Sequence, residues 1–155
     1  MEQKTIVCHI EFLQWKELSG EEQLLIEAAK EATHGSYAPY SQFFVGAALR
    51  LQNGSIVIGN NQENASYPCG LCAERTALFA ANSQYPSLRV EALAIAARNT
   101  DGFLKSPITP CGSCRQVMLE VEHRQKTPIK IYLYGEMGVY KIASSADLLP
   151  LQFTL

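Results

Sequence analysis

Apolar residues recur at intervals of three and four along several parts of this chain, and that spacing predicts helices. The clearest stripe runs through residues 21–33, where leucine and alanine mark one face of a helix. Ser19 and Glu22 have the spacing of a capping box, so we expect this helix to begin there. Residues 72–81 and the segment opened by Pro110 are rich in good helix formers and predict two further helices.

Shorter stretches are apolar or alternate between apolar and polar residues, which is typical of strands. Strands are predicted over residues 4–13, 43–51, 55–59, 90–97 and 129–134. Asn53-Gly54, between two of them, is a strong hairpin signal, and a short helix is expected at 146–149. This order predicts an α/β fold of three layers, α/β/α, in which a mixed sheet carries helices on both faces. We expect one domain over 19–155, with residues 1–18 as an N-terminal extension packed on it.

Composition narrows the class of protein. The chain has 155 residues, of which 47% are hydrophobic and 18% charged, values typical of a globular protein. No stretch reaches the run of about 18 apolar residues that a membrane helix needs, and the N-terminus has no secretory pattern. A net charge of −2 and the lack of a basic stripe argue against nucleic acid as a partner. We therefore expect a cytoplasmic protein with a small-molecule substrate.

The five cysteines point to a metal. Cys69 and Cys72 form one C-x-x-C pair, Cys111 and Cys114 form another, and Cys8 stands alone as an expected buried thiol. In a reducing compartment such pairs indicate metal binding rather than disulfides. Spacing alone leaves two readings open: a closed structural zinc site made of all four paired thiolates, or a site with fewer ligands. A thioredoxin-like redox role fits less well, because neither pair lies in a convincing redox context.

Glu74 favours a catalytic site. Cys72-Ala73-Glu74 followed by Pro110-Cys111-Gly112-Ser113-Cys114 is similar to the zinc-deaminase signature H-x-E with P-C-x-x-C, with cysteine in place of histidine. Three thiolates would leave one position on zinc for water, and zinc would make hydroxide available at neutral pH. Glu74 would shuttle protons, although it could also be an exposed carboxylate at a helix start. Arg75 could offset the thiolate charge or be a surface arginine.

With these motifs in order, the chain resembles the short, homotetrameric, zinc-dependent cytidine deaminases. The stretches that carry the resemblance are Tyr37-Ala38-Pro39-Tyr40-Ser41, Phe43, Val45-Gly46-Ala47-Ala48-Leu49, Asn61-Gln62-Glu63-Asn64-Ala65, Cys72-Ala73-Glu74-Arg75-Thr76-Ala77, Pro110-Cys111-Gly112-Ser113-Cys114-Arg115-Gln116 and Leu148-Leu149-Pro150. They run from about residue 20 to the end. The resemblance implies a cytidine deaminase-like fold and a hydrolase of pyrimidine salvage, in which zinc-bound hydroxide attacks C4 and converts cytidine and deoxycytidine to uridine and deoxyuridine with release of ammonia.

The resemblance also implies a role for each matching residue. Cys72, Cys111 and Cys114 hold Zn²⁺, Glu74 is the proton shuttle and Arg75 tempers the thiolate charge. Asn61 and Glu63 bind the ribose hydroxyls, Phe43 packs on the pyrimidine and the Ala73 backbone holds the base edge. Tyr67 and Phe153 reach a neighbouring subunit's site, which implies a homotetramer with shared sites. Modified or antibiotic nucleosides remain open as substrates, and editing of nucleic acid remains a less favoured possibility.

Overall fold

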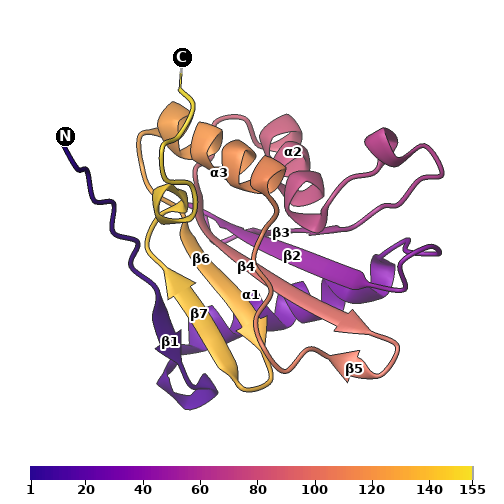
Figure 1. The fold of residues 1–155 in the computed structure, drawn as a ribbon. Helices are drawn as coiled ribbons and strands as arrows, with labels where there is room; N and C mark the ends of the chain where they lie inside the picture. The colour runs from indigo at the N-terminus through magenta and orange to yellow at the C-terminus, as the bar shows by residue number, and fades with distance from the viewer. Residues whose placement is uncertain (155) are drawn as a thin grey trace.

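The computed structural model describes residues 1–154, and their strands form one sheet (Figure 1). The strands are β1 (Glu11–Leu13), β2 (Phe44–Leu51), β3 (Ile56–Asn60), β4 (Val90–Asn99), β5 (Gly102–Phe103), β6 (Lys130–Gly135) and β7 (Gly138–Ile142). Their order is β1-β7-β6-β4-β2-β3, with β5 paired to β4. β4 and β6 are parallel, and the other pairs are antiparallel. The predicted mixed sheet is therefore confirmed.

Helices cover both faces of this sheet, so the predicted three-layer architecture is also confirmed. α1 (Gly20–Ala32) lies behind the sheet in Figure 1, and α2 (Ala73–Gln84) and α3 (Gly112–Gln125) lie together on the opposite face. The 3-10 turns are η1 (Trp15–Glu17), η2 (Thr33–Gly35), η3 (Tyr67–Cys69) and η4 (Ser145–Leu148). Across residues 1–154, no helix combines the length and apolar character needed to cross a bilayer.

Strand β4 shows how the two layers of helices divide the core. Its side chains alternate, so that Ala92 and Ala94 belong to the core under α1. Leu93 and Ile95 belong to the core under α2 and α3. Because both faces of β4 are buried over residues 92–97, this part of its sequence is a continuous apolar run rather than an alternating one.

Local sequence signals fix several element boundaries. Ser19 caps α1: its hydroxyl accepts from the Glu22 amide at 3.3 Å, and the Glu22 carboxylate accepts from the Ser19 amide at 2.8 Å. The capping box is therefore confirmed. β2 and β3 form the predicted hairpin around Asn53-Gly54, where Gly54 takes a φ of 84° that favours glycine. The helix predicted over 72–81 begins one residue later and continues to Gln84.

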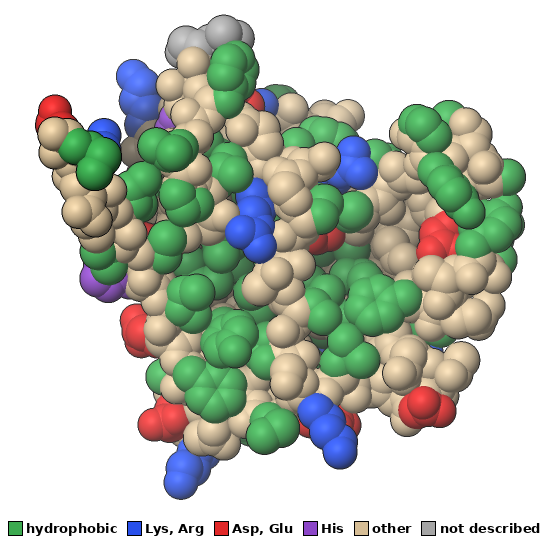
Figure 2. Space-filling view, viewed as in Figure 1, with side chains coloured by type: hydrophobic (Ala, Val, Ile, Leu, Met, Phe, Trp, Pro, Cys, Tyr) green, Lys and Arg blue, Asp and Glu red, His purple; other side chains and the backbone are tan. Residues whose placement is uncertain are grey.

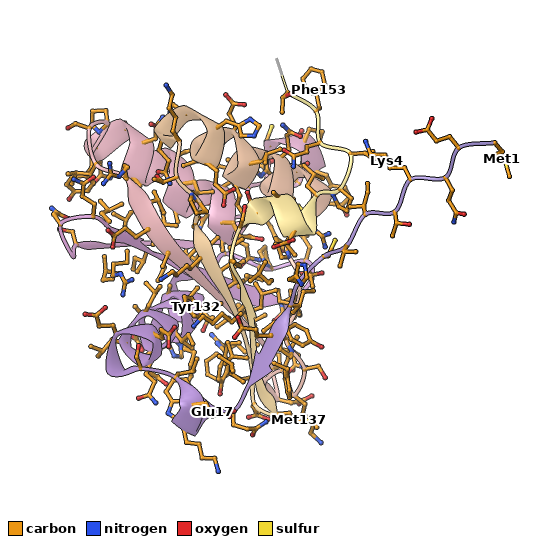
Figure 3. The ribbon with its side chains drawn as sticks, turned by 90° about the vertical axis from the view of Figure 1, so that its left-hand side faces the viewer. Met1, Lys4, Glu17, Tyr132, Met137 and Phe153 are labelled. Atoms are coloured by element: carbon orange, nitrogen blue, oxygen red, sulfur yellow. The ribbon has the colours of Figure 1, made fainter. Side chains whose placement is uncertain are left out.

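The predicted strand over residues 4–13 is wrong in length, because only Glu11–Leu13 pairs in the sheet. Its partner β7 ends at Ile142, one residue beyond the partner of Glu11, so β7 has no residues opposite positions 4–9. Met1 to Lys4 point away from the body in Figure 3. Cys8 is exposed and not the buried thiol that its apolar neighbours suggested. An alternating pattern cannot reveal that its partner strand is short.

The rest of the extension packs on the body through aromatic rings. Phe12 lies edge-on to Tyr140 of β7 with ring centroids 5.5 Å apart, and Trp15 lies edge-on to Tyr134 of β6 at 6.2 Å. The Lys30 ammonium of α1 lies 5.7 Å from the Trp15 ring centroid. These contacts agree with an extension that packs on the body, while the division between residues 18 and 19 stays a prediction.

Three further details differ from expectation. β5 and β7 were not predicted; β7 follows β6 across a two-residue turn and begins at Gly138, which has a φ of 151°. The tail helix expected at 146–149 is the 3-10 turn η4. Pro110 precedes α3 by two residues rather than lying in its first turn, because Cys111 occupies the N-cap.

Gly59 of β3 lets α2 approach the sheet closely. A Cβ atom built on Gly59 would lie 2.6 Å from the Ala73 carbonyl oxygen and would also overlap the Ala77 amide nitrogen. Backbone cannot move away as a flexible side chain can. The absence of a side chain at Gly59 therefore fixes the first turns of α2 against the sheet.

Candidate metal centre and the cavity beside it

Three cysteine sulfurs meet where α2 and α3 begin. Cys72 is the N-cap of α2, Cys111 is the N-cap of α3, and Cys114 lies in the first turn of α3. The Sγ atoms of Cys72 and Cys111 are 3.8 Å apart, and those of Cys111 and Cys114 are 3.5 Å apart. Tetrahedral Zn–S bonds of about 2.3 Å require sulfurs about 3.8 Å apart, so this group fits zinc.

Cys69 stands apart from this group. It ends the exposed turn η3, whereas the metal-ligating atoms that lie within 4.8 Å of one another belong to Cys72, Cys111 and Cys114. In residues 1–154, Cys72, Cys111 and Cys114 form the group of three or more histidine, cysteine or acidic side chains that could hold a metal ion. A set of three thiolates leaves a fourth tetrahedral position, which favours an open site over the closed four-cysteine alternative.

The three thiols share protons in a way that favours a divalent cation. The hydrogen bond with Cys114, aided by Arg75 and Cys111, lowers the pKa of Cys72 to about 5, although burial opposes the shift. The same bond to Cys72, together with burial, raises the pKa of Cys114. One sulfur is therefore ionised at the expense of another, and only a cation can stabilise all three thiolates together.

Arg75 lies beside these sulfurs, which is the first of the two positions that the sequence left open for it. Its Nη2 is 3.9 Å from the Cys72 Sγ, and this hydrogen bond raises the pKa of the guanidinium. Its Nε is buried and has no hydrogen-bond partner among the described residues. The N-termini of α2 and α3 add partial positive charge at the two N-cap sulfurs. Both sources reduce the negative charge of a three-thiolate set.

Glu74 is buried rather than exposed at the helix start. It lies in the first turn of α2 and is 4% exposed. Burial, and in addition the charge of the Cys72 thiolate, raise the pKa of Glu74. A carboxyl group with a raised pKa beside a metal site can accept and return protons near neutral pH.

An open cavity of about 510 Å³ lies next to the metal centre. Its lining residues are Tyr40, Ser41, Asn61, Gln62, Glu63, Asn64, Tyr67, Gly70, Leu71, Cys72 and Arg75. Figure 2 shows the hollow between the body and the projecting segment on the right, which carries η3. The cavity thus brings together three residues predicted to bind substrate, Asn61, Glu63 and Tyr67, with one predicted zinc ligand.

Hydrogen bonds to the backbone hold Asn61 at the wall of this cavity. The Asn61 side chain accepts from the Val45 amide at 2.9 Å and donates to the Phe43 carbonyl at 2.8 Å. It therefore links the start of β2 to the segment after β3. The side-chain oxygen keeps a second lone pair for another donor.

Glu63 is fixed by the loop before β2. Its carboxylate accepts from the Tyr40 amide at 2.9 Å, from the Ser41 amide at 3.3 Å and from the Ser41 hydroxyl. These bonds, led by that of the Ser41 hydroxyl, lower the pKa of Glu63. No role was predicted for Tyr40 or Ser41 individually. Their place in the Tyr37–Ser41 stretch, which carries part of the family resemblance, could have indicated that they lie at the site.

Three other predicted site residues, Phe43, Ala73 and Phe153, do not line the cavity of this chain. Ala73 is fully buried at the start of α2, and Phe43 packs partly buried against the core under α2 and α3. Phe153 is 67% exposed and lies in the C-terminal segment above the helices (Figure 3). Tyr67 lines the cavity but is 79% exposed. The exposure of Tyr67 and Phe153 leaves both rings free to contact a second chain.

Known proteins resemble this chain over most of its length. Residues 19–128 match the family described as the cytidine and deoxycytidylate deaminase zinc-binding region. A cytidine deaminase of Halalkalibacterium halodurans is 45% identical over 132 residues, which cover 85% of this chain and 93% of that protein. One from Sporosarcina psychrophila is 41% identical over 131 residues, covering 84% and 89%.

Solved structures show the same likeness. The crystal structure of cytidine deaminase from Burkholderia pseudomallei has a TM-score of 0.71 and 44% identity, and the match covers 84% of this chain and 97% of that one. The enzyme from Mycobacterium tuberculosis has a TM-score of 0.66 and 36% identity, with coverage of 85% and 96%.

Proposed function

This chain belongs to the cytidine deaminase family, and from that premise we propose that it hydrolyses the exocyclic amine of cytidine and deoxycytidine. It is an enzyme whose metal is Zn²⁺. The observation that carries the proposal is the buried carboxyl of Glu74 beside three thiols, one of which, Cys72, lines a cavity of about 510 Å³. The products are uridine or deoxyuridine and ammonia.

In the proposed reaction the protein supplies a metal site and a proton carrier. Cys72, Cys111 and Cys114 hold the zinc, which when bound acts as a Lewis acid and makes hydroxide available at neutral pH. Glu74 takes one proton from the attacking water and delivers it to the ring nitrogen as the C–O bond forms at C4. It then carries the second proton, from the new hydroxyl at C4, to the amine, and the C–N bond breaks to release ammonia. The buried position and raised pKa of Glu74 suit both directions of transfer.

Arg75 keeps the metal site from becoming too electron-rich in this proposal. Three thiolates with Zn²⁺ carry a net charge of −1, which weakens a Lewis acid. The Arg75 guanidinium donates to the Cys72 sulfur and draws off part of that charge. Two helix N-termini act in the same direction.

The nucleoside would lie in the cavity with its sugar against Asn61 and Glu63. The ionised carboxylate of Glu63, held by the loop around Ser41, is an acceptor for ribose hydroxyls. Groups that hydrogen-bond a sugar reject free bases, because they would otherwise be left unpaired. Phe43 would pack against the pyrimidine, and the Ala73 backbone would hold the edge of the base.

Assembly completes the proposed site. Tyr67 and Phe153 would reach the site of a neighbouring subunit in a homotetramer, and their exposure in the single chain supports this. We also propose that the enzyme acts in the cytoplasm in pyrimidine salvage, on nucleosides rather than nucleic acid. Residues 19–155 would form the catalytic domain, with 1–18 as an extension.

The proposal is tested by following the ultraviolet absorbance of cytidine and deoxycytidine with the purified zinc-loaded protein. We expect conversion that stops after zinc is removed by a chelator and returns when zinc is restored. Failure to convert either nucleoside with zinc bound would refute the proposed substrates. Modified nucleosides would then be assayed, and a protein inactive on all of them would support a structural zinc site instead.

A further inference from the structure

Arg115, in the first turn of α3, bonds two carbonyl groups from distant parts of the chain. Its Nε donates to the Pro110 carbonyl at 2.7 Å, and its Nη1 donates to the Leu148 carbonyl at 2.7 Å. Both bonds are short, as expected for charge-assisted hydrogen bonds. Arg115 directly follows Cys114, so one side chain joins the metal centre to the C-terminal segment.

The bond to Pro110 fixes the approach to the metal site. Pro110 is buried and directly precedes Cys111, the N-cap of α3. The carbonyl before an N-cap lies outside the helix ladder, and a buried carbonyl needs a donor. The Arg115 guanidinium is such a donor, and it thereby orients the peptide that carries the Cys111 sulfur.

The bond to Leu148 fixes the start of the C-terminal segment, which lies against α3 (Figure 1). Leu148 ends η4, and residues 149–154 follow it. The next residue of α3 continues the attachment, because Gln116 Nε2 donates to the Phe153 carbonyl at 3.1 Å. Glu122 fixes the start of η4 by accepting from the Ser145 amide at 2.8 Å. Several hydrogen bonds thus attach the segment to α3. Of the α3 residues that make them, Arg115 alone also bonds the Pro110 carbonyl beside Cys111.

We propose that Arg115 is a positioning residue that couples retention of the metal to the order of the C-terminal segment. This inference rests on the proposed function in one respect, the role of Cys111 as a zinc ligand. The planar guanidinium carries donors on separate nitrogens and can hold two carbonyls at once, whereas a lysine ammonium is a single point of charge. A residue outside the ligand set that orients a ligand commonly changes metal affinity by about ten- to a hundredfold.

The test compares four variants of the full-length, zinc-loaded protein. R115M removes both bonds, and R115K keeps the charge but has one nitrogen, which cannot take the places of both Nε and Nη1. Q116A removes only the bond to Phe153. R124M is the matched control, because Arg124 lies exposed in the last turn of α3. Two quantities are measured: the rate of zinc transfer to a coloured chelator, and amide hydrogen exchange across residues 149–154.

We expect R115M to release zinc about tenfold faster and to exchange amides of 149–154 faster than the wild type. R115K should recover at most one of the two properties, Q116A should change only the exchange, and R124M should change neither. A variant R115M with both properties within twofold of the wild type would overturn the coupling. So would faster zinc release with an unchanged C-terminal segment, or full rescue of both properties by R115K.

Both measurements are made without turnover, so they separate this inference from the proposed function. A protein that holds zinc, responds to R115M as expected and leaves cytidine and deoxycytidine unchanged would refute the substrates and keep the coupling. A wild type that deaminates cytidine, with an R115M variant that matches it in zinc release and amide exchange, would support the substrates and overturn the coupling. Thermal unfolding of each variant checks that it is folded at the assay temperature, and R115K provides the comparison if R115M is not.

Discussion

Replacing Glu22 by glutamine should destabilise the protein in a way that depends on pH. The Glu22 carboxylate accepts from the Ser19 amide at 2.8 Å, the Tyr132 hydroxyl at 2.7 Å and the Lys141 ammonium at 2.9 Å. Burial raises the pKa of Glu22, but these three donors outweigh it and set the pKa to about 2. Tyr132 reaches from β6 toward α1 (Figure 3), so Glu22 joins the helix to the sheet.

The size of the effect follows from this shift. A carboxyl pKa lowered from 4.5 to about 2 corresponds to an upper limit of roughly 3 kcal/mol at neutral pH. The carboxylate lies near the surface, where solvent screens its partners, so we expect about 1 kcal/mol. For a chain of this length that lowers Tm by about 2–4 °C. Because the folded pKa is depressed, the stabilisation is present above about pH 4.5 and is lost as pH falls toward 2.

The assay is thermal or urea unfolding of wild type and E22Q at pH 7 and at pH 3. The difference between the two proteins should shrink at pH 3, as the unfolded wild type gains a proton. E21Q is the matched control, because Glu21 is a neighbour with an 80% exposed side chain paired to Arg50, and its loss should cost under about 0.5 kcal/mol. Equal stability of E22Q and wild type at pH 7, or a difference that does not change at pH 3, would refute the reasoning.

Three further predictions concern the metal centre and the packing of α2. C72S should abolish zinc retention while C69S keeps one zinc per chain, measured by elemental analysis; the opposite pattern would support a different ligand set. Zinc binding to the metal-free protein should release protons and strengthen as pH rises, because the Cys114 thiol must lose the proton that its raised pKa retains; calorimetry in buffers of different ionisation enthalpy that shows no proton release would contradict this. G59A should lower Tm by several degrees, because the new methyl group would overlap the backbone of α2; an unchanged Tm would show that α2 can shift freely.

Features set by residues close in the sequence were predictable. The capping box at Ser19 and the hairpin at Asn53-Gly54 depend on local hydrogen bonds and backbone angles, and both are present. The grouping of Cys72 with Cys111 and Cys114 was suggested by the C-x-E and P-C-x-x-C motifs, because the spacing of the two C-x-x-C pairs alone left a four-cysteine site open. A short motif fixes side-chain direction once the helix boundary is known.

Features that depend on distant partners were not predictable. The strand over 4–13 is short because β7 ends at Ile142, which nothing in the N-terminal pattern indicates. The bond from Arg115 to Leu148 joins residues far apart in sequence, so no local motif predicts it. The role of Phe153 depends on another chain, and a single chain can show only that the ring is exposed.

The most direct test of the account is turnover of cytidine by zinc-loaded E74Q, with wild type and E120Q assayed beside it. Glu120 is an exposed carboxylate of α3, so E120Q should match the wild type. We predict that E74Q keeps its zinc and binds cytidine but loses about 10²- to 10⁴-fold in kcat, the usual contribution of a proton-transfer group. Turnover of E74Q close to that of the wild type, with zinc bound, would contradict the claim that Glu74 moves the protons of the reaction.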